Sequence, residues 1–259
     1  YQQNFLSKEH PELVEDVQSA VNSDAVFAPI LGIYVMGSFG SISQTSASDL
    51  DIWICHQDDL SEQDQQRLAE KTKKISQWAS TYHVEMHFYL MTQQRFRNER
   101  YSDPLTKENS GSAQYMLLLE EFYRSAVRLS GKPLLWLHLW IEDEKQYEAE
   151  VSRLVEAGEL DPNDWVDFGG LGQFSASEYF GASLWQLYKG IDSPYKSVMK
   201  ILLLETYAQE YPNAHLIARQ FKEDLLSGRS TAAHHFDPYI AILERISQYL
   251  TAHSEFKRL

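Results

Sequence analysis

A Gly-Ser pair at the end of an apolar stretch, followed by an Asp-x-Asp triplet, constrains this chain more than any other feature. Residues 30–36 are apolar and β-branched and run into Gly37 and Ser38, which predicts a buried strand that ends in a turn. Asp49 and Asp51 follow eleven and thirteen residues after Ser38, at the start of a second apolar stretch that we also expect to be a strand. Because side chains alternate along a strand, the two carboxylates should project from the same face of the sheet.

The paired aspartates indicate a site for a divalent cation. Two carboxylates held side by side repel each other unless water or cations screen them. Oxygen ligands on a rigid strand suit Mg²⁺ (or Mn²⁺), which completes its ligand shell with water and substrate phosphates. Simple solvated acids at the start of a strand are the alternative interpretation.

Glu85 is the candidate for a third carboxylate. It lies in residues 83–91, where apolar and polar side chains alternate as in a strand, and it shares the polar face with His87. If that strand pairs beside Asp49 and Asp51, three carboxylates could hold two metal ions about 4 Å apart for in-line attack at phosphorus. An exposed Glu85 without a role and a structural His87 are the alternatives.

Gly37 and Ser38 are suited to hold a phosphate. A glycine at a strand end lets the backbone approach closely, its N–H groups can point at phosphate oxygens, and the serine hydroxyl adds a donor. The full order is a strand, a Gly-Ser pair, a spacer of ten residues, an Asp-x-Asp strand and a carboxylate on a later strand. This order resembles the DNA-polymerase-β-like nucleotidyltransferase superfamily.

The first half of the sequence predicts mixed strands and helices, and the second half predicts mostly helix. We therefore expect an α+β fold, with a nucleotidyltransferase core of a small mixed sheet flanked by helices and an all-helical C-terminal part. We place the catalytic core at residues 1–160 and a helical domain that contributes to the nucleotide site at residues 161–259. The periodicity and capping signals predict strands at 30–36, 50–55, 83–91 and 134–140, helices at 61–82, 112–129, 142–158, 175–189, 194–210, 215–226 and 238–253, loops at 38–48 and 95–110, and a flexible joint at 169–172.

Charge and composition exclude several classes of function. The chain has 23 Lys and Arg against 37 Asp and Glu, a net charge of −14, which argues against a nucleic-acid-binding surface. The single cysteine, Cys55, cannot form an internal disulfide, and it fits a reducing, cytoplasmic setting. Apolar stretches fall short of the ~20 residues that span a membrane. Because the sequence does not start with Met, we expect a piece of a longer polypeptide.

Several longer motifs are similar to those of the class I adenylate cyclases of enterobacteria and their relatives. They lie at residues 34–38, 48–56, 117–129, 163–171 and 178–196, the last reading Glu178-Tyr-Phe-Gly-Ala-Ser-Leu-Trp-Gln-Leu-Tyr-Lys-Gly-Ile-Asp-Ser-Pro-Tyr-Lys196. The resemblance implies conversion of ATP to 3′,5′-cyclic AMP and pyrophosphate. It also implies that a catalytic part, to which this chain belongs, is followed by a regulatory part linked to sugar-uptake signalling, with a regulatory partner.

The resemblance further implies roles for single residues. By the superfamily pattern, Gly37 and Ser38 hold the β- and γ-phosphates, and Asp49 and Asp51 hold both metal ions. Glu85 is the match for the carboxylate that holds the catalytic metal near the attacking ribose 3′-OH.

Cations from the helical half are expected to bind the triphosphate as well. In related nucleotidyltransferases a Lys, a Ser and a Tyr from the helical part contact the triphosphate, which implies Lys196, Ser193 and Lys189 here. The helix that starts at Pro194 also offers free N–H groups. Exposed helix-end lysines with no such role are the alternative.

Three further functions stay open from the sequence alone. The chain could transfer a nucleotide to an external acceptor, or it could be a nucleotide-binding or interaction lobe that is inactive without the rest of the parent chain. A sugar-nucleotide glycosyltransferase using Asp-x-Asp for Mn²⁺ fits poorly, because it explains neither the Gly-Ser pair nor the helical second half.

Overall fold

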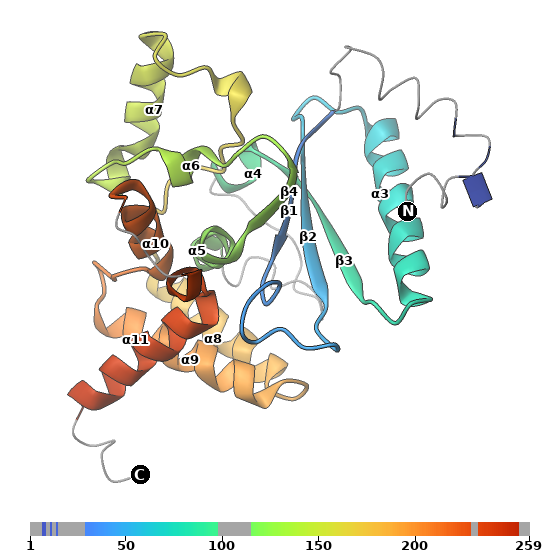
Figure 1. Cartoon of the computed structure of the whole chain (residues 1–259). Coiled ribbons are helices and arrows are strands. Elements are labelled where there is room, and N and C mark those ends of the chain that lie inside the picture. Colours follow the sequence, from blue (N-terminus) through green and yellow to red (C-terminus); the bar gives the residue numbers. More distant parts are fainter. Residues whose placement is uncertain are drawn as a thin grey trace.

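A computed structural model describes residues 29–97, 115–228 and 233–253 of the chain, together with residues 7, 8, 11 and 14. Its centre is a four-stranded mixed sheet with the strand order β3-β2-β1-β4 (Figure 1). Strands β1 and β2 pair antiparallel, β2 and β3 pair parallel, and β4 pairs antiparallel with β1. The strands are β1 Ile30–Met36, β2 Leu50–His56, β3 Met86–Thr92 and β4 Val127–Gly131.

Helices cover both faces of this sheet. Figure 1 shows α3 on one side and α5 with the C-terminal helices on the other. The helices are α3 Glu62–Ser80, α4 Gln94–Arg97, α5 Tyr115–Ser125, α6 Leu135–His138, α7 Tyr147–Glu156, α8 Ala176–Lys189, α9 Pro194–Gln209, α10 Ile217–Leu226 and α11 Pro238–Ala252. Short 3₁₀ turns lie at Glu144–Gln146, Pro162–Asp164 and Ala233–Phe236. The architecture is α+β with a small mixed sheet and a helical C-terminal half, as the sequence predicts.

The two faces of β2 enter different cores. Ile52 and Ile54 pack with Val35 in a small cluster that Leu68 of α3 covers. Trp53 faces the opposite side, where its ring stacks on Phe122 of α5 with centroids 4.1 Å apart. The alternation predicted for the Asp-x-Asp strand is therefore confirmed, since side chains with odd numbers point toward α5 and those with even numbers toward α3.

The C-terminal helices attach to the sheet through α5. Glu120 of α5 is fully buried, forms an ion pair with Arg124, and accepts hydrogen bonds from the Tyr207 hydroxyl of α9 at 3.2 Å and the Ala218 N–H of α10 at 3.2 Å. A buried carboxylate is stable only when such donors satisfy it, so this network fixes α9 and α10 relative to α5. A division of the chain at residue 160 stays a prediction.

The predicted C-terminal end of the helix at 112–129 is wrong. Helix α5 ends at Ser125, and Val127–Gly131 form the edge strand β4, which pairs with β1. The helix prediction extends to Leu129 because Ala126 and Leu129 follow Phe122 at helical spacing, but pairing with a strand distant in sequence overrides that local preference. Gly131 has φ +83, and a Cβ there would clash with the carbonyl oxygen of Leu31. The glycine is needed where β4 passes close to β1.

The predicted strand at 134–140 is also wrong. Leu134 makes an isolated parallel bridge to Val166, and Leu135–His138 then form the short helix α6. A run of contiguous apolar residues does not distinguish a buried strand from a buried helical turn, because both bury every side chain.

Other predicted elements keep their type but shift at their ends. The strand predicted from residue 83 starts at Met86, and the helix predicted at 142–158 divides into a 3₁₀ turn and α7. The loop predicted at 95–110 begins inside α4 and otherwise lies outside the described residues. The predicted flexible joint at 169–172 is a packed connection, since a Cβ at Gly170 would meet Tyr147 at 2.7 Å and the Leu171 side chain is buried.

Within the described part of the chain, every helix is too short or too polar to traverse a bilayer.

Candidate active site

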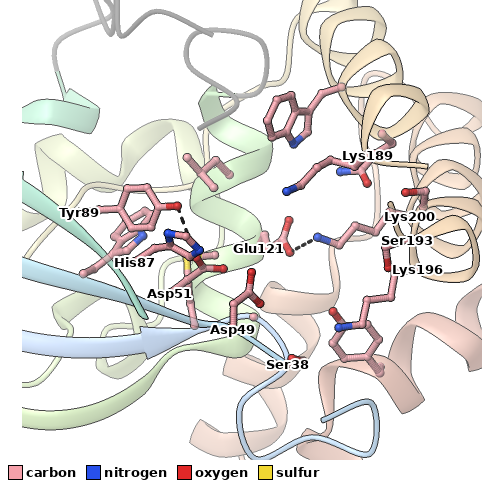
Figure 2. Close-up of a pocket in the computed structure, with 18 of the residues that line it drawn as sticks. Ser38, Asp49, Asp51, His87, Tyr89, Glu121, Lys189, Ser193, Lys196 and Lys200 are labelled. Atoms are coloured by element: carbon pink, nitrogen blue, oxygen red, sulfur yellow. Dashed lines mark hydrogen bonds and ion pairs between the residues drawn. The ribbon is translucent and has the colours of Figure 1, made fainter. Parts of the chain in front are cut away.

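A cavity of about 330 Å³ lies between the sheet and helices α5, α8, α9 and α11. Every site residue predicted from the sequence lines it, and both halves of the chain contribute. These residues are Gly37, Ser38, Asp49, Asp51, Glu85, Lys189, Ser193 and Lys196. Figure 2 shows the two aspartates on one wall and the lysines on the other.

Asp51 and Asp49 form the acidic wall. Asp51 lies in β2, between Met36 of β1 and His87 of β3, while Asp49 precedes the strand. Burial, and after it the negative charge of Asp49, raise the pKa of Asp51 to about 6, although His87 acts in the opposite direction. The hydroxyl of Tyr89 donates a hydrogen bond to Oδ1 of Asp51 at 3.4 Å. This wall therefore carries excess negative charge that a bound cation would neutralise.

Glu85 lines the cavity, is largely exposed and contacts His87. Its carbonyl accepts a hydrogen bond from the N–H of Leu50 at 2.9 Å, which places it directly before β3. Its carboxylate lies 3.0 Å from Nε2 of His87, and 69% of its side chain is exposed. Among the residues that the structure describes, no three His, Cys, Asp or Glu side chains are grouped closely enough to hold a metal ion. The donor set in place is thus the Asp49–Asp51 pair, which fits a divalent cation that takes its other oxygens from water or phosphate.

Gly37 and Ser38 form the turn at the end of β1. Gly37 has φ +88, a backbone conformation that favours glycine, and its N–H donates to Oγ of Ser125 at 3.1 Å. Ser38 is buried, and its carbonyl accepts from both the N–H and the hydroxyl of Ser41. These bonds order the turn, and the N–H of Gly37 already donates to a partner within the protein.

The basic wall comes from the end of α8 and the start of α9. Nζ of Lys189 lies 5.6 Å from the ring centre of Trp185, and Nζ of Lys196 lies 5.9 Å from that of Tyr239. Ser193 occupies the N-cap position of α9 without a side-chain capping bond to that helix. These side chains place positive charge across the cavity from the aspartates.

Lys200 and Glu121 extend this charge pattern deeper into the cavity. Nζ of Lys200 lies 2.6 Å from Oε1 of Glu121 (Figure 2). Burial lowers the pKa of Lys200, but the charge and hydrogen bond of Glu121, together with Tyr239, hold it above the ordinary value. In the same way burial raises the pKa of Glu121, and Lys200 and then Arg124 hold it below the ordinary value. Both groups are therefore charged, and the pair lies next to Asp51.

Comparisons with known proteins agree with this geometry. The family profile described as "Adenylate cyclase NT domain" matches residues 1–137, and the one described as "Adenylate cyclase, class-I, second domain" matches residues 174–259. The chain belongs to the class I adenylate cyclase family. The cavity draws residues from both matched regions, so the family's first two domains together build it.

Three relatives named adenylate cyclase show how much of the family the chain represents. It is 69% identical to the Haemophilus influenzae protein and 62% identical to the Pasteurella multocida protein, and each match covers 100% of this chain and 31% of the relative. It is 49% identical to the Escherichia coli K12 protein, over 89% of this chain and 27% of the relative. The chain thus spans about a third of the length of these relatives.

One solved structure also matches. A spectinomycin adenyltransferase from Enterococcus faecialis, crystallised with ATP and spectinomycin, aligns with a TM-score of 0.38 and 14% identity over 92% of this chain and 89% of that chain. A likeness this weak carries no argument about the site.

Several cavity residues of this class I cyclase chain were missed from the sequence. Lys200 lies one helical turn after Lys196, on the same face of α9, and that spacing could have identified it. Glu121, Trp185 and Tyr239 carry no comparable signal, because only the packing of their helices turns them to the cavity.

Proposed function

We propose that this chain is the catalytic part of an adenylate cyclase that converts ATP to 3′,5′-cyclic AMP and pyrophosphate. One observation carries the proposal: residues predicted to hold metal and triphosphate, from two separate parts of the sequence, line a single cavity. Family membership supports the same activity, since the relatives are named adenylate cyclases. The order of the Gly-Ser pair and the Asp-x-Asp strand, which resembles that of polymerase-β-like nucleotidyltransferases, supports the proposal as well.

Asp49 and Asp51 are the residues that would hold a divalent cation, Mg²⁺ or Mn²⁺. The cation would supply Lewis-acid stabilisation of the phosphates and lower the pKa of the attacking hydroxyl. In this proposal Glu85 joins the two aspartates as the third ligand once its side chain leaves His87. The fit of the aspartate pair is supported by the raised pKa of Asp51, because burial and the charge of Asp49 both disfavour its ionised form and a bound cation would favour it.

The triphosphate is proposed to lie between the Gly37-Ser38 turn and the lysine wall. Lys196, Ser193 and Lys189 bind and orient its β- and γ-phosphates from the helical side. A protein with a net charge of −14 needs such local cations to bind a polyanion, and the cavity gathers them opposite the acidic wall.

Cyclisation requires that the cavity hold one ATP molecule in a bent conformation, with its ribose 3′-oxygen next to its α-phosphorus. The ribose 3′-oxygen forms a bond to the α-phosphorus, the bond from that phosphorus to the β-phosphate oxygen breaks, and the 3′-OH proton leaves. Holding both atoms in place makes the step unimolecular, which contributes up to about 7–11 kcal/mol. The lysines compensate the charge that develops on the leaving pyrophosphate.

The lining of the same cavity includes apolar side chains that could hold the adenine base. Met91, Leu118 and Trp185 are among them, and Trp185 lies on α8. An indole ring is a favourable stacking surface for a base. We assign these side chains to adenine, so that the ribose lies near the aspartates and the phosphates extend toward Lys196.

Product analysis tests this function. Purified protein is incubated with ATP and Mg²⁺ or Mn²⁺, and the expected products are cyclic AMP and pyrophosphate in equal amounts. Formation of an adenylylated acceptor with pyrophosphate would instead show a transferase. Tight binding of Mg-ATP with no product, while a full-length relative cyclises ATP, would show a nucleotide-binding lobe. A cytoplasmic setting and control by a sugar-uptake partner through the further length of the relatives are part of the same proposal.

A further inference from the structure

The carboxylate of Asp237 joins the loop that follows Ser38 to helix α11. Asp237 is the N-cap residue of α11, and its Oδ1 accepts hydrogen bonds from the N–H groups of Tyr239 at 2.9 Å and Ile240 at 3.1 Å. Its other oxygen, Oδ2, accepts a hydrogen bond from the N–H of Ile42 at 2.6 Å. Ile42 lies in the loop that follows Ser38, which Figure 1 shows extending from the ends of β1 and β2 toward α11. The two oxygens of Asp237 thus hold two elements that lie 195 residues apart in sequence.

The middle of this loop has hydrogen bonds of its own, such as that from the N–H of Gln44 to the carbonyl of Ser41 at 3.1 Å, and the bond to Asp237 ties the loop to α11. The start of the loop is anchored where the N–H of Gly37 donates to Ser125. Near its middle, the side chain of Ile42 is 69% exposed, so burial contributes little to its position. The hydrogen bond to Asp237 is short and charge-assisted, the kind that contributes most to the placement of a backbone segment.

Asp237 also lies beside the lysine wall. Tyr239, two residues along, is buried, lines the cavity, and has Nζ of Lys196 5.9 Å from its ring centre. Helix α11 packs along α9, which carries Lys196. The residue that fixes the start of α11 therefore connects the two sides of the cavity between which a triphosphate would bind.

We infer that Asp237 is a positioning residue that sets the spacing between the Gly37-Ser38 turn and the Lys196 wall. The inference rests on the proposed function, because it assigns the spacing to a triphosphate ligand. A preorganised site binds more tightly because the ordering cost is met before the ligand arrives. Loss of the bond from Ile42 to Asp237 should therefore weaken triphosphate binding while the helix and the core remain intact.

Two substitutions of Asp237 separate its capping of α11 from its hydrogen bond to Ile42. In Asp237→Ser the hydroxyl still caps α11, since Ser is as good an N-cap as Asp, but the shorter side chain cannot also reach Ile42. In Asp237→Asn the single amide oxygen still caps α11, but the amide N–H₂ group then faces the N–H of Ile42, and two donors cannot form the bond to the loop. Asp161→Ser is the matched control, because it changes another N-cap aspartate, which accepts from the N–H of Asn163 at 2.8 Å and does not line the cavity.

Calorimetry with magnesium tripolyphosphate and amide hydrogen exchange are measured on each variant. Asp237→Ser should weaken tripolyphosphate binding about tenfold, the loss expected for one charge-assisted hydrogen bond. It should also speed exchange at the Ile42 amide and leave the Tyr239 and Ile240 amides protected. Asp237→Asn should lose affinity to a similar extent, because it too keeps the cap without the loop bond, and Asp161→Ser should change neither reading.

A second variant tests the same bond from the other side. Ile42→Pro removes the donor without altering α11, and it should weaken tripolyphosphate binding as Asp237→Ser does. The double variant should bind no more weakly than either single one, because both remove the same interaction.

Faster exchange at Ile42 with unchanged tripolyphosphate affinity would overturn the inference, and so would additive losses in the double variant. Failure of the unchanged protein to bind tripolyphosphate or Mg-ATP at all would count against the proposed function itself, which distinguishes the two.

Discussion

Asp51→Asn should make the metal-free protein more stable while it removes the metal site. Burial and the charge of Asp49 raise the pKa of Asp51 from 3.8 to about 6, so above that pH the folded protein holds an unfavourable ionised carboxylate. At about 1.4 kcal/mol per pKa unit, the full cost is about 3 kcal/mol. Because the cavity admits some solvent to Asp51, we expect a gain in unfolding free energy of about 1–2 kcal/mol for the amide.

The sign of the pH dependence follows from the raised pKa. The neutral carboxyl is favoured in the folded state, so its stabilising effect is complete below pH 3.8 and is lost as the pH rises through about 6. The stability difference between Asp51→Asn and the unchanged protein should therefore be largest above pH 6 and shrink as the pH falls toward 4. Urea unfolding in EDTA at several pH values, followed by tryptophan fluorescence, measures this difference.

A matched substitution on the surface should act in the opposite direction. Asp64 is exposed in the first turn of α3, and a hydrogen bond from Ser61 lowers its pKa. Asp64→Asn should thus slightly destabilise the protein at neutral pH.

Added Mg²⁺ should stabilise the unchanged protein and have no such effect on Asp51→Asn. If Asp51→Asn is less stable than the unchanged protein in EDTA at pH 7.5, the electrostatic description of this wall is wrong.

Two further predictions concern buried charges outside the cavity. Glu178 accepts a hydrogen bond from the N–H of Leu117 at 2.6 Å, and burial, despite such bonds, raises its pKa to about 7. The folded protein favours the neutral carboxyl of Glu178, and this stabilisation is lost as the pH rises through about 7. Glu178→Gln should therefore raise the free energy of unfolding at pH 8 and leave it unchanged below pH 4.5, which paired urea titrations can test. Lys222 is fully buried, 3.3 Å from Glu144 and 4.2 Å from the ring centre of Trp136. Lys222→Met should cost about 3–5 kcal/mol, because the Glu144 carboxylate keeps its hydrogen bonds from Trp136 and Leu171 but loses its counter-charge. Glu144→Gln in the same chain should recover most of this cost, and equal stability of the single and double variants would refute the prediction.

The sequence predicts the acidic wall because strand geometry leaves little choice. Side chains alternate, and Ile52 and Ile54 must be buried under α3, so Asp51 is forced to the opposite face. The same rule places Glu85 and His87 on one face, and the two side chains are in contact there. Alternation does not predict whether the Glu85 carboxylate reaches His87 or the aspartates, because that depends on its side-chain rotamer.

The errors come from segments whose structure depends on distant partners. Strand β4 exists because β1 offers it an edge, and the turn at Gly131 lets it approach Leu31. Helix α6 follows a bridge to Val166, about thirty residues away, that no local pattern indicates. Glu121 was missed for a similar reason, since only the packing of α5 against the sheet and α9 turns it into the cavity.

The central claim is that Asp49 and Asp51 hold a divalent ion beside a triphosphate bound across the two halves of the chain. A crystal structure with Mn²⁺ and a non-hydrolysable ATP analogue tests it most directly, because anomalous scattering locates the metal without assumptions. We expect Mn²⁺ bound to both aspartates, phosphates between the Gly37-Ser38 turn and Lys196, and adenine on Trp185. Mn²⁺ bound elsewhere, or a nucleotide seated outside this cavity, would contradict the account.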